Sequence, residues 1–385
     1  MTLFNNYKVE YYDGADWLEI PYLVELNATV GRRQITDSWS SSTASFTFRY
    51  PTGFASPYTD LQVDVPIRFF TPSNTTNAGW TGFIRDVTAS WGKPYAGGVG
   101  EADTLTVQAE GALARWGRII GDGFVPSTNT ANGQLTEIVN HYGLSWNGNL
   151  TSEPVKAVGT TSSILDWFQK FLNTTQGRPL DGMAISGDPE AQPNVWVISN
   201  ATNLFTTVNF SDVANNATND IYDVLNFDSL ADNYVTQVIV TSPDYADQTA
   251  QVGTEPYRSF TVDTYANSAA QAADIASYIL ATSQGQVIAP SEVSAISSGQ
   301  NDGRIDTMNV PNAFYIFARL PTFFTKITFR GVTYVARIEG ATISANPEQT
   351  RVTYYLSPQE ANPWLILDSA TNGVLDTNKL ALYSY

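Results

Sequence analysis

The sequence lacks cysteine altogether and contains a single histidine among its 385 residues. Without cysteine there is no disulfide framework and no thiolate metal site. With His141 alone, a metal site that needs two histidines is excluded, and any nucleophile–histidine pair would have to use this residue. His141 lies in the helical pattern EIVNHYGL, just before a predicted C-terminal cap at Gly143. A structural role is therefore the better interpretation of His141.

Charged residues are also scarce, at 15% of the chain, and they are unevenly signed. The formal net charge is −17 and no basic run occurs, which argues against nucleic-acid binding through phosphate neutralisation. No apolar run is long enough to span a bilayer, and the first residues lack a signal-peptide pattern. We expect a protein that is made in a cytoplasm and has no stable membrane association.

Motifs for catalysis are missing as well. The sequence has no G-x-S-x-G, no Walker A and no G-x-G-x-x-G pattern. A glycosidase needs only two facing carboxylates, but the sequence does not select a pair among its candidates, which are Asp103, Glu110, Asp166, Asp181 and Glu339. Two acidic loops, residues 188–194 and 301–306, lack the calcium-loop spacing and are interpreted as turns. We therefore predict no catalytic, cofactor-binding or metal-binding residues, no cofactor and no enzymatic activity.

Asparagine and tryptophan are frequent enough to raise two further possibilities. Seven N-x-[ST] triplets begin at Asn27, Asn74, Asn149, Asn173, Asn200, Asn209 and Asn216. Without a signal peptide they are explained by the high Asn and Thr content, not by glycosylation. Nine tryptophans could form a sugar-stacking platform, although Trp17, Trp80 and Trp167 lie in patterns typical of a core.

What the sequence does contain is a repeated β-pattern. Residues 66–109 and 323–356 each read as three strands with period-two alternation. Within them, WTGFIRDVTAS (80–90) and YVARIEGATIS (334–344) share the order aromatic, any, small, any, Ile, two variable residues, small or branched apolar, Thr, apolar, Ser. We interpret this as one antiparallel unit used twice. Chance similarity between strands, or one large β-sandwich without duplication, would also account for the pattern.

The remaining segments complete the predicted architecture. Residues 7–12 and 16–20 form a hairpin around Asp13-Gly14, and the first β-unit should contain almost no helix. Helical periodicity follows over 133–144, capped by Gly143, and over 160–175, capped by Ser162 or Ser163. The fold class is therefore mainly β with α+β insertions, arranged as two antiparallel β-barrels separated by a small α+β module. The expected ranges are 1–118 for the first barrel, 119–224 for the α+β module, 225–358 for the second barrel with an inserted helix at 268–283, and 359–385 for an extended C-terminal segment.

Several stretches resemble the hub proteins at the tail tip of long-tailed (siphovirus-type) bacteriophages, which are related to the baseplate hub of contractile tails. GRRQITDSWSSSTASFTFRYPTGFASPY (31–58) is similar to the opening of that family, and VPIRFF (65–70) with WTGFIRDV (80–87) to its recurrent strand pattern. ANPWLILD (361–368) and GVLDTNKLAL (373–382) resemble the endings of minor tail proteins. The resemblance covers most of the chain.

The resemblance implies a structural virion protein whose barrels are of the tail-tube type. Three chains would form a homotrimeric ring of six barrels that adapts the sixfold tube to a threefold tip and lets the genome pass. The implied partners are the distal tail protein or tube ring above, the tape-measure C-terminus in the lumen, and tip or fibre proteins below, with DNA only as passing cargo. The alternative is a carbohydrate-binding receptor-recognition protein, either a tail adhesin or a secreted β-sandwich lectin.

The charge adds one expectation about such a ring. Acidic groups facing the lumen would repel the passing phosphates over a Debye length of roughly 8 Å. The basic side chains should then point toward subunit contacts or the outer surface, and we assign Arg32, Arg33, Arg85 and Arg337 to those places.

Overall fold

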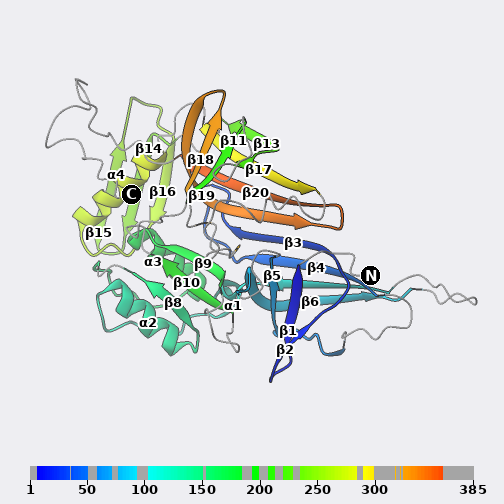
Figure 1. Ribbon diagram of the computed structural model, residues 1–385. Coiled ribbons are helices and arrows are strands. Elements are labelled where there is room, and N and C mark those ends of the chain that lie inside the picture. The colour runs from blue at the N-terminus through cyan, green and yellow to red at the C-terminus, as the bar shows by residue number, and fades with distance from the viewer. Residues whose placement is uncertain are drawn as a thin grey trace, which may run out of the picture.

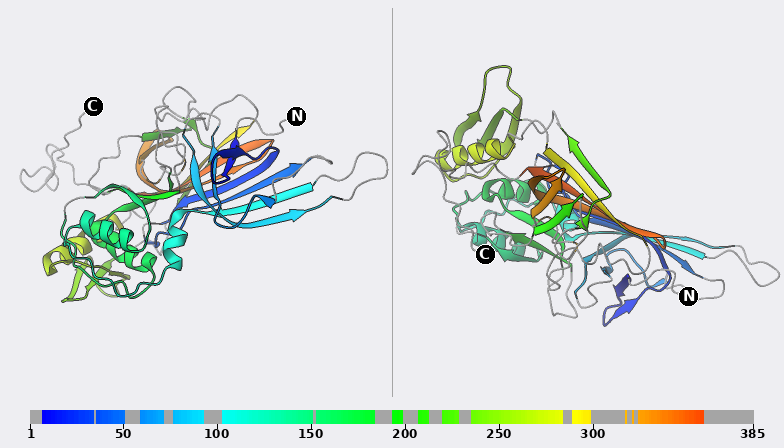
Figure 2. Two further views of the ribbon diagram at one scale, coloured as in Figure 1. Left: turned by 90° about the horizontal axis from the view of Figure 1, so that it is seen from below. Right: turned by 45° about the horizontal axis from the view of Figure 1, so that its top comes forward.

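The computed structural model describes residues 7–34, 36–50, 59–71, 77–92, 103–150, 153–183, 193–198, 207–212, 220–228, 235–283, 289–298, 317, 321 and 324–358. Over these ranges the chain is mainly β, with a few helices. The long strands occupy one side of the molecule, and the helices with two small sheets occupy the other (Figures 1 and 2).

The first β-unit is a sheet in the spatial order β2-β1-β5-β6-β7-β4-β3. Its strands are β1 (Lys8–Tyr12), β2 (Trp17–Glu19), β3 (Leu23–Gly31), β4 (Thr43–Tyr50), β5 (Pro66–Phe70), β6 (Trp80–Ser90) and β7 (Asp103–Glu110). Alternation determines which face is buried: in β4, Ala44, Phe46, Phe48 and Tyr50 are inside, and the residues between them are half-buried or exposed.

The predicted hairpin of β1 and β2 is present, but its loop differs from the two-residue type I′ turn suggested by Asp13-Gly14. Tyr12 lies opposite Trp17, so the loop runs from Asp13 to Asp16. The Asp13 carboxylate accepts hydrogen bonds from the backbone N–H groups of Ala15 and Asp16, both at 2.8 Å. This side-chain turn stabilises a longer loop than the dipeptide predicts.

The second β-unit has the order β12-β11-β18-β19-β20-β17-β13. Its strands are β11 (Thr207–Ser211), β12 (Asp220–Ile221), β13 (Val224–Asp228), β17 (Ala289–Ser298), β18 (Phe324–Phe329), β19 (Val332–Ala345) and β20 (Gln349–Pro358). Taken strand by strand in chain order, this is the order of the first unit. Two pairings differ, because β11 is parallel to both β12 and β18, whereas β1 is antiparallel to both β2 and β5.

The register repeats along with the strand order. Phe83 lies opposite Pro66 and Glu110, and its counterpart Arg337 lies opposite Phe324 and Ser357. Each central strand has a register shift at the same place, between Ile84 and Asp86 in β6 and between Ile338 and Gly340 in β19. Since an ordinary chance similarity would not reproduce a β-bulge at the aligned residue, the predicted repeat of one unit is confirmed.

Both sheets curl without closing. In the second unit, the Phe227 ring of β13 lies 5.4 Å from Phe329 of β18 and 5.2 Å from Tyr334 of β19, measured between ring centroids. In the first, Phe46 of β4 lies 6.2 Å from Phe69 of β5. Among the described strands no ladder joins the two ends of either β-unit, so the structure shows curved open sheets and the two expected barrels are not confirmed.

The α+β module follows the first unit. It contains α1 (Ala112–Arg118), α2 (Ala131–His141), β8 (Trp146–Asn149), α3 (Ile164–Thr175), β9 (Arg178–Met183) and β10 (Asn194–Ile198). The predicted cap of α3 is Ser163, whose hydroxyl accepts from the Asp166 N–H at 3.1 Å. Helix α1 was missed, because the first unit was expected to be free of helix up to residue 118. Its sequence ALARWGR combines good helix formers with a buried Trp116.

A third small element interrupts the second unit. Strands β14 (Gln237–Ser242), β15 (Tyr245–Gln251) and β16 (Ser259–Asp263) pair only with one another in the described chain, and α4 (Ala269–Ser283) covers them. The predicted helix over 268–283 is therefore confirmed. The strands around it form a separate sheet, however, instead of joining the second barrel as the periodicity suggested. Conversely, β11 and β12, which fall within the expected module range 119–224, extend the second β-unit.

Some predictions fall on residues outside the described ranges. These are the triplets at Asn74, Asn200 and Asn216, the loop 301–306, most of the loop 188–194, and the C-terminal segment 359–385.

Candidate functional site at the joint between the two β-units

The two β-units are joined by one antiparallel ladder. Strand β19 is long enough to pair with β18 through residues 332–337 and with β3 through residues 340–345. Its register opposite β3 runs from Gly340–Gly31 to Ala345–Leu26. We call this ladder the joint, and Figure 1 shows it where blue β3 lies beside the orange strands.

Two glycines allow the strands to approach closely at the start of the joint. A Cβ on Gly31 would lie 2.3 Å from the Glu339 carbonyl oxygen, and one on Gly340 would lie 2.6 Å from the Val30 carbonyl oxygen. Gly31 also has a φ of +76°, a backbone conformation that L side chains rarely adopt. The contact is backbone against backbone, so it cannot be relieved by turning a side chain.

We expect Gly31→Ala to destabilise the protein by about 2 kcal/mol, the sum of left-handed backbone strain and displacement of the ladder. The matched control is Gly143→Ala. Gly143 has a similar φ of +64°, but a Cβ at this position would meet nothing within 4 Å, so only the backbone strain applies. Chemical denaturation of both variants measures the difference. Equal losses would show that the close approach at the joint contributes nothing.

The bulged residue of β19, Glu339, lies at the centre of a buried ion network. Its side chain is 0% exposed. One carboxylate oxygen accepts from Arg32 Nε at 2.9 Å, and the other accepts from Arg178 at 2.9 Å and from the Ser357 hydroxyl at 2.6 Å. Arg178 also donates to the Pro321 carbonyl at 2.8 Å. The network thus joins the residue that follows β3 in the first β-unit, β9 of the α+β module, and β19 and β20 of the second β-unit.

The electrostatics of the network favour ionised partners. Burial alone would raise the pKa of Glu339, but Arg178, Arg32 and Arg337 outweigh it and hold that pKa well below its usual range. Burial lowers the pKa of Arg178 to about 10, with Glu339 opposing the shift. Both groups are therefore charged at neutral pH, and each compensates the burial of the other.

A second buried carboxylate fastens the α+β module to the first unit. Asp181 of β9 accepts from the Ser42 N–H at 2.7 Å, from the Ser41 and Ser42 hydroxyls at 3.0 Å each, and from the Leu113 N–H at 3.1 Å. Trp80 Nε1 in turn donates to the Ser42 hydroxyl at 2.8 Å. No arginine takes part in these contacts. Burial consequently raises the pKa of Asp181, although the four hydrogen bonds oppose the shift.

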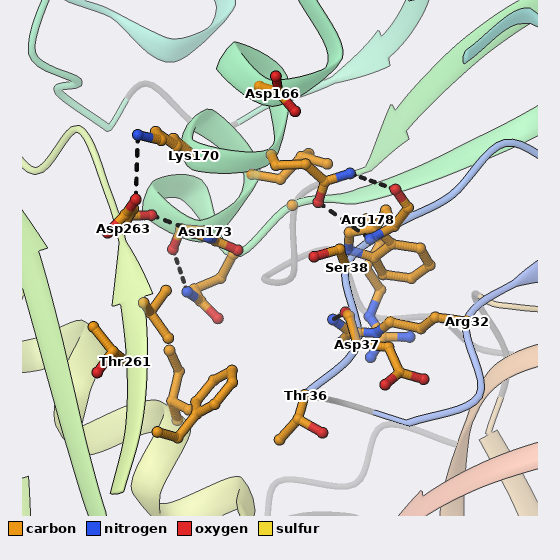
Figure 3. Close-up of a pocket in the computed structure, with 18 of the residues that line it drawn as sticks. Arg32, Thr36, Asp37, Ser38, Asp166, Lys170, Asn173, Arg178, Thr261 and Asp263 are labelled. Carbon is orange, nitrogen blue, oxygen red and sulfur yellow. Dashed lines mark hydrogen bonds and ion pairs between the residues drawn. The ribbon is translucent and has the colours of Figure 1, made fainter. Parts of the chain in front are cut away.

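A cleft of about 570 Å³ lies beside the joint, between the 32–39 segment, α3 and β16 (Figure 3). Several of its polar groups have partners within the chain. Lys170 lies 3.2 Å from Asp263, Asn173 donates to the Asp263 carbonyl at 3.0 Å, and Asp37 accepts from the Gln34 N–H at 3.0 Å. Arg32 stacks 4.4 Å from the centre of the Trp39 ring. The cleft offers polar contacts of both signs, and its lining contains neither histidine nor cysteine to act as a nucleophile–base pair.

Four of the five candidate carboxylates have structural contacts within the chain. Asp103 accepts from the Gly92 N–H at 2.7 Å at one end of β7, and Glu110 pairs with Arg118 at the other. Asp166 lies in the first turn of α3 and lines the cleft. Asp181 and Glu339 are saturated by donors, as described above. Within the described ranges no group of three or more His, Cys, Asp or Glu side chains is arranged to hold a metal ion.

His141 and the tryptophans follow their structural interpretations. His141 Nε2 lies 2.9 Å from Asp122, and its ring stacks on Phe124 at 4.0 Å between centroids. Trp80 and Trp167 are buried in cores. Trp17 is half-buried, with the Arg68 guanidinium 4.0 Å from its ring centre. These three rings do not form an exposed sugar-stacking platform.

The four selected arginines are partly engaged inside the chain. Arg32 contacts Glu339 in the joint, and Arg33 lies 5.2 Å from the centre of the Tyr355 ring. Arg85 donates to Gln108, and Arg337 lies 5.3 Å from the centre of the Phe324 ring. Arg32 therefore acts at the contact between the two β-units of one chain.

Comparisons with known proteins rest on structure. No family model matches the sequence, and no curated protein matches it either. The fold is similar to that of a tail protein from Neisseria meningitidis, with a TM-score of 0.61 and 10% identity over 92% of this chain and 97% of that one. A 43 kDa tail protein of prophage MuSo2 from Shewanella oneidensis gives 0.59 and 10% over 90% and 98%. This chain has the fold of phage tail proteins.

A third solved structure connects the fold to hub proteins. It is a component of the type VI secretion system of E. coli, described as similar to the T4 bacteriophage tail proteins gp27 and gp5. The TM-score is 0.56, with 12% identity over 92% of this chain and 77% of that chain. The resemblance to tail hub proteins predicted from the sequence is thus confirmed for the fold. No helix in the described ranges is long and apolar enough to cross a membrane.

Proposed function

We propose that this chain is a structural subunit of a phage-type tail tip, in which three copies form a ring of six β-units around the path of the genome. The observation that carries the proposal is the repeat of seven-strand order, register and bulge position in the two units. Two equivalent units in one chain let a threefold assembly present six similar surfaces to a sixfold tube. The similarity of the fold to two solved tail proteins supports the same role.

The proposed parts are the ones expected from the sequence, a first tube-type domain over 1–118, the α+β module over 119–224, a second tube-type domain over 225–358 and an extended segment over 359–385. The structure adjusts them in three places: α1 joins the module, β11 and β12 join the second domain, and β14–β16 with α4 form a separate element within it. The partners are a distal tail protein or tube ring above, the tape-measure C-terminus in the lumen, and tip or fibre proteins below. The site of action is the virion tail tip, after synthesis in the host cytoplasm. Three copies carry three times −17, that is −51, so a neutral to acidic lumen would let DNA pass as cargo.

The proposed role requires no catalysis. Four of the five candidate carboxylates are engaged in structural contacts, and the cleft lining, which includes the fifth, Asp166, contains neither histidine nor cysteine. Hydrolysis of peptidoglycan or host polysaccharide by the purified chain, lost on Asp166→Asn, would contradict this part of the proposal.

The test of the ring is the mass and symmetry of the purified full chain. Light scattering should give three times the chain mass of 42.1 kDa, and averaged electron micrographs should show a ring with six similar lobes. Labelled protein in intact particles should lie on the tail axis. A chain that stays monomeric at high concentration and binds sugars in that state would instead favour the carbohydrate-recognition alternative.

A further inference from the structure

Because the β-unit is repeated, each strand of the joint has an equivalent strand in the other unit. These two equivalent strands are not paired with each other within the chain. Through the shared registers, Gly340–Ala345 of β19 correspond to residues 86–91 at the end of β6. By the same mapping through β4 and β17, Leu26 and Asn27 of β3 correspond to Leu225 and Asn226 of β13. A register shift on β17 follows Asn226, and we continue the correspondence along β13 itself, so that Ala28 and Thr29 match Phe227 and Asp228. The equivalent positions in β3 and β13 also share the dipeptide Leu-Asn, at 26–27 and 225–226.

These two corresponding edges have no ladder partner among the described strands. In the described ranges, strand β5 pairs with β6 at Trp80–Phe83, and no described strand pairs with the same edge of β6 beyond Ile84. Strand β13 pairs with β17 on one side, and no described strand pairs with its other side. An open edge presents unpaired backbone N–H and C=O groups and is a template for another strand.

On both open edges, buried and exposed side chains alternate in the same order as at the equivalent positions of the joint. In the joint, Ala28 and Ile343 face the core opposite each other. Their counterparts are Phe227 of β13, which is half-buried after the exposed Asn226, and Ala89 of β6, which is half-buried between two exposed residues. In the joint the small Ala28 lies opposite the large Ile343, and in the equivalent pair the large Phe227 would lie opposite the small Ala89. The combined size of the two side chains is therefore similar in both pairs.

The mapping also accounts for an exposed tryptophan. Ala345 lies opposite Leu26 in the joint and corresponds to Trp91, which directly follows β6 and is 62% exposed. Its predicted opposite residue is Leu225, which is only half-buried. A tryptophan–leucine contact across the edge would remove both from water.

We infer that β13 of one copy pairs antiparallel with the end of β6 in the next copy, forming between chains the same ladder that β3 and β19 form within one. The predicted opposite residues are Leu225 with Trp91, Asn226 with Ser90, Phe227 with Ala89, and Asp228 with Thr88. This inference rests on the proposed ring and specifies its subunit contact. The molecule that pairs with the open edge of β6 is a second copy of this chain, because the register and the alternation of buried side chains match those of the joint within the chain. Such a head-to-tail contact closes into a ring when its rotation matches that of the joint.

One difference separates the two ladders. In the joint, Gly340 approaches Gly31 closely, but the residue of β6 that corresponds to Gly340 is Asp86. The residue that corresponds to the bulged Glu339 is Arg85. The contact between chains therefore lacks the glycine pair and the buried Glu339 network. It should be shorter and more easily separated than the joint.

Engineered cysteines test the register, since the chain has none of its own. Antiparallel opposite residues have Cα atoms roughly 4.5–5.5 Å apart, within disulfide range. Asn226→Cys with Ser90→Cys should give covalent dimers and trimers on oxidation. The corresponding pair inside the chain, Asn27→Cys with Ser344→Cys, should lose its free thiols without forming multimers. Asn226→Cys with Thr104→Cys, one strand further across β7, should give neither.

The possible outcomes distinguish failure of the inferred β13–β6 contact from failure of the proposed ring. A trimer by light scattering in which Asn226→Cys with Ser90→Cys does not cross-link, or cross-links no better than the Thr104 pair, would overturn the inference and leave the ring intact. A chain that remains monomeric under all conditions would reject both.

A second variant tests the same contact without cysteines. Trp91→Lys should weaken trimer formation roughly tenfold or more, as expected for an aromatic anchor at an interface, with the melting temperature unchanged. The control is Val252→Lys, also an exposed apolar residue at 41% but next to β15, which should leave the trimer unaffected. Equal effects of the two variants would count against the inference.

Discussion

Replacement of Glu339 by glutamine should cost about 3–5 kcal/mol of folding free energy, because it leaves Arg178 and Arg32 buried without their anion. The loss is large since the side chain is fully buried and accepts from three donors. The measurement is denaturant unfolding followed by tryptophan fluorescence, with the transitions of separate parts resolved if they do not coincide. Asp223→Asn is the control. Its carboxylate lies 3.3 Å from Arg351 in the same β-unit but is 40% exposed, so it should cost at most about 1 kcal/mol.

The same variant makes a prediction about pH. The pKa of Glu339 is lowered in the folded chain, so its contribution is complete above the unfolded value of about 4.3 and is lost as pH falls through the folded value. The stability difference between the parent and Glu339→Gln should therefore be constant from pH 7 to about 5 and shrink in stronger acid. A difference that grows toward acid would contradict the assignment of Glu339 as a buried anion.

Much of the sheet could be predicted from the sequence, because alternation over a half-buried surface is a local signal. Residues 80–90 form β6 with the bounds of the aligned segment, and 334–344 lie within β19. The aligned pattern even spanned the bulge, since Arg85 and Glu339 occupy the same place in it. Helices α3 and α4 were also predicted, from the amphipathic stripe and from the Ala-rich segment.

The partners of strands were harder to predict, because pairing is decided by tertiary contacts. The strands β14 and β16 have the same alternation as the long sheet, yet they pair in parallel with each other and pack on α4. Nothing in the residues of β14 distinguishes these two destinations. The pairing of β3 with β19, about 300 residues apart in the chain, has the same origin.

For the buried networks around Glu339 and Asp181, the sequence analysis identified the two carboxylates but not their partners or their role. Glu339 and Asp181 were both among the candidate carboxylates, but as possible catalytic groups, and their partners Arg178 and Ser42 were not singled out. A signal existed for Glu339: it interrupts an apolar strand at the position of Arg85 in the other copy of the repeat. A charge at an otherwise buried strand position predicts an ion partner. Which arginine supplies it depends on the packing of β9, which the sequence does not specify.

Asp181→Ala should destabilise the protein by about 3 kcal/mol, because it removes the acceptor of two buried backbone N–H groups, those of Ser42 and Leu113. Its pH dependence should have the opposite sign to that of Glu339. Asp181 faces only neutral donors, so burial raises its pKa in the folded chain, and the parent loses stability relative to the variant as pH rises from the unfolded value of about 3.9. The stability difference should thus be largest in acid and smaller at neutral pH. Unfolding free energies of parent and variant between pH 3 and 7 measure it, with Asp223→Asn again as the surface control. A difference that increases with pH would show that the Ser41, Ser42 and Leu113 donors outweigh burial.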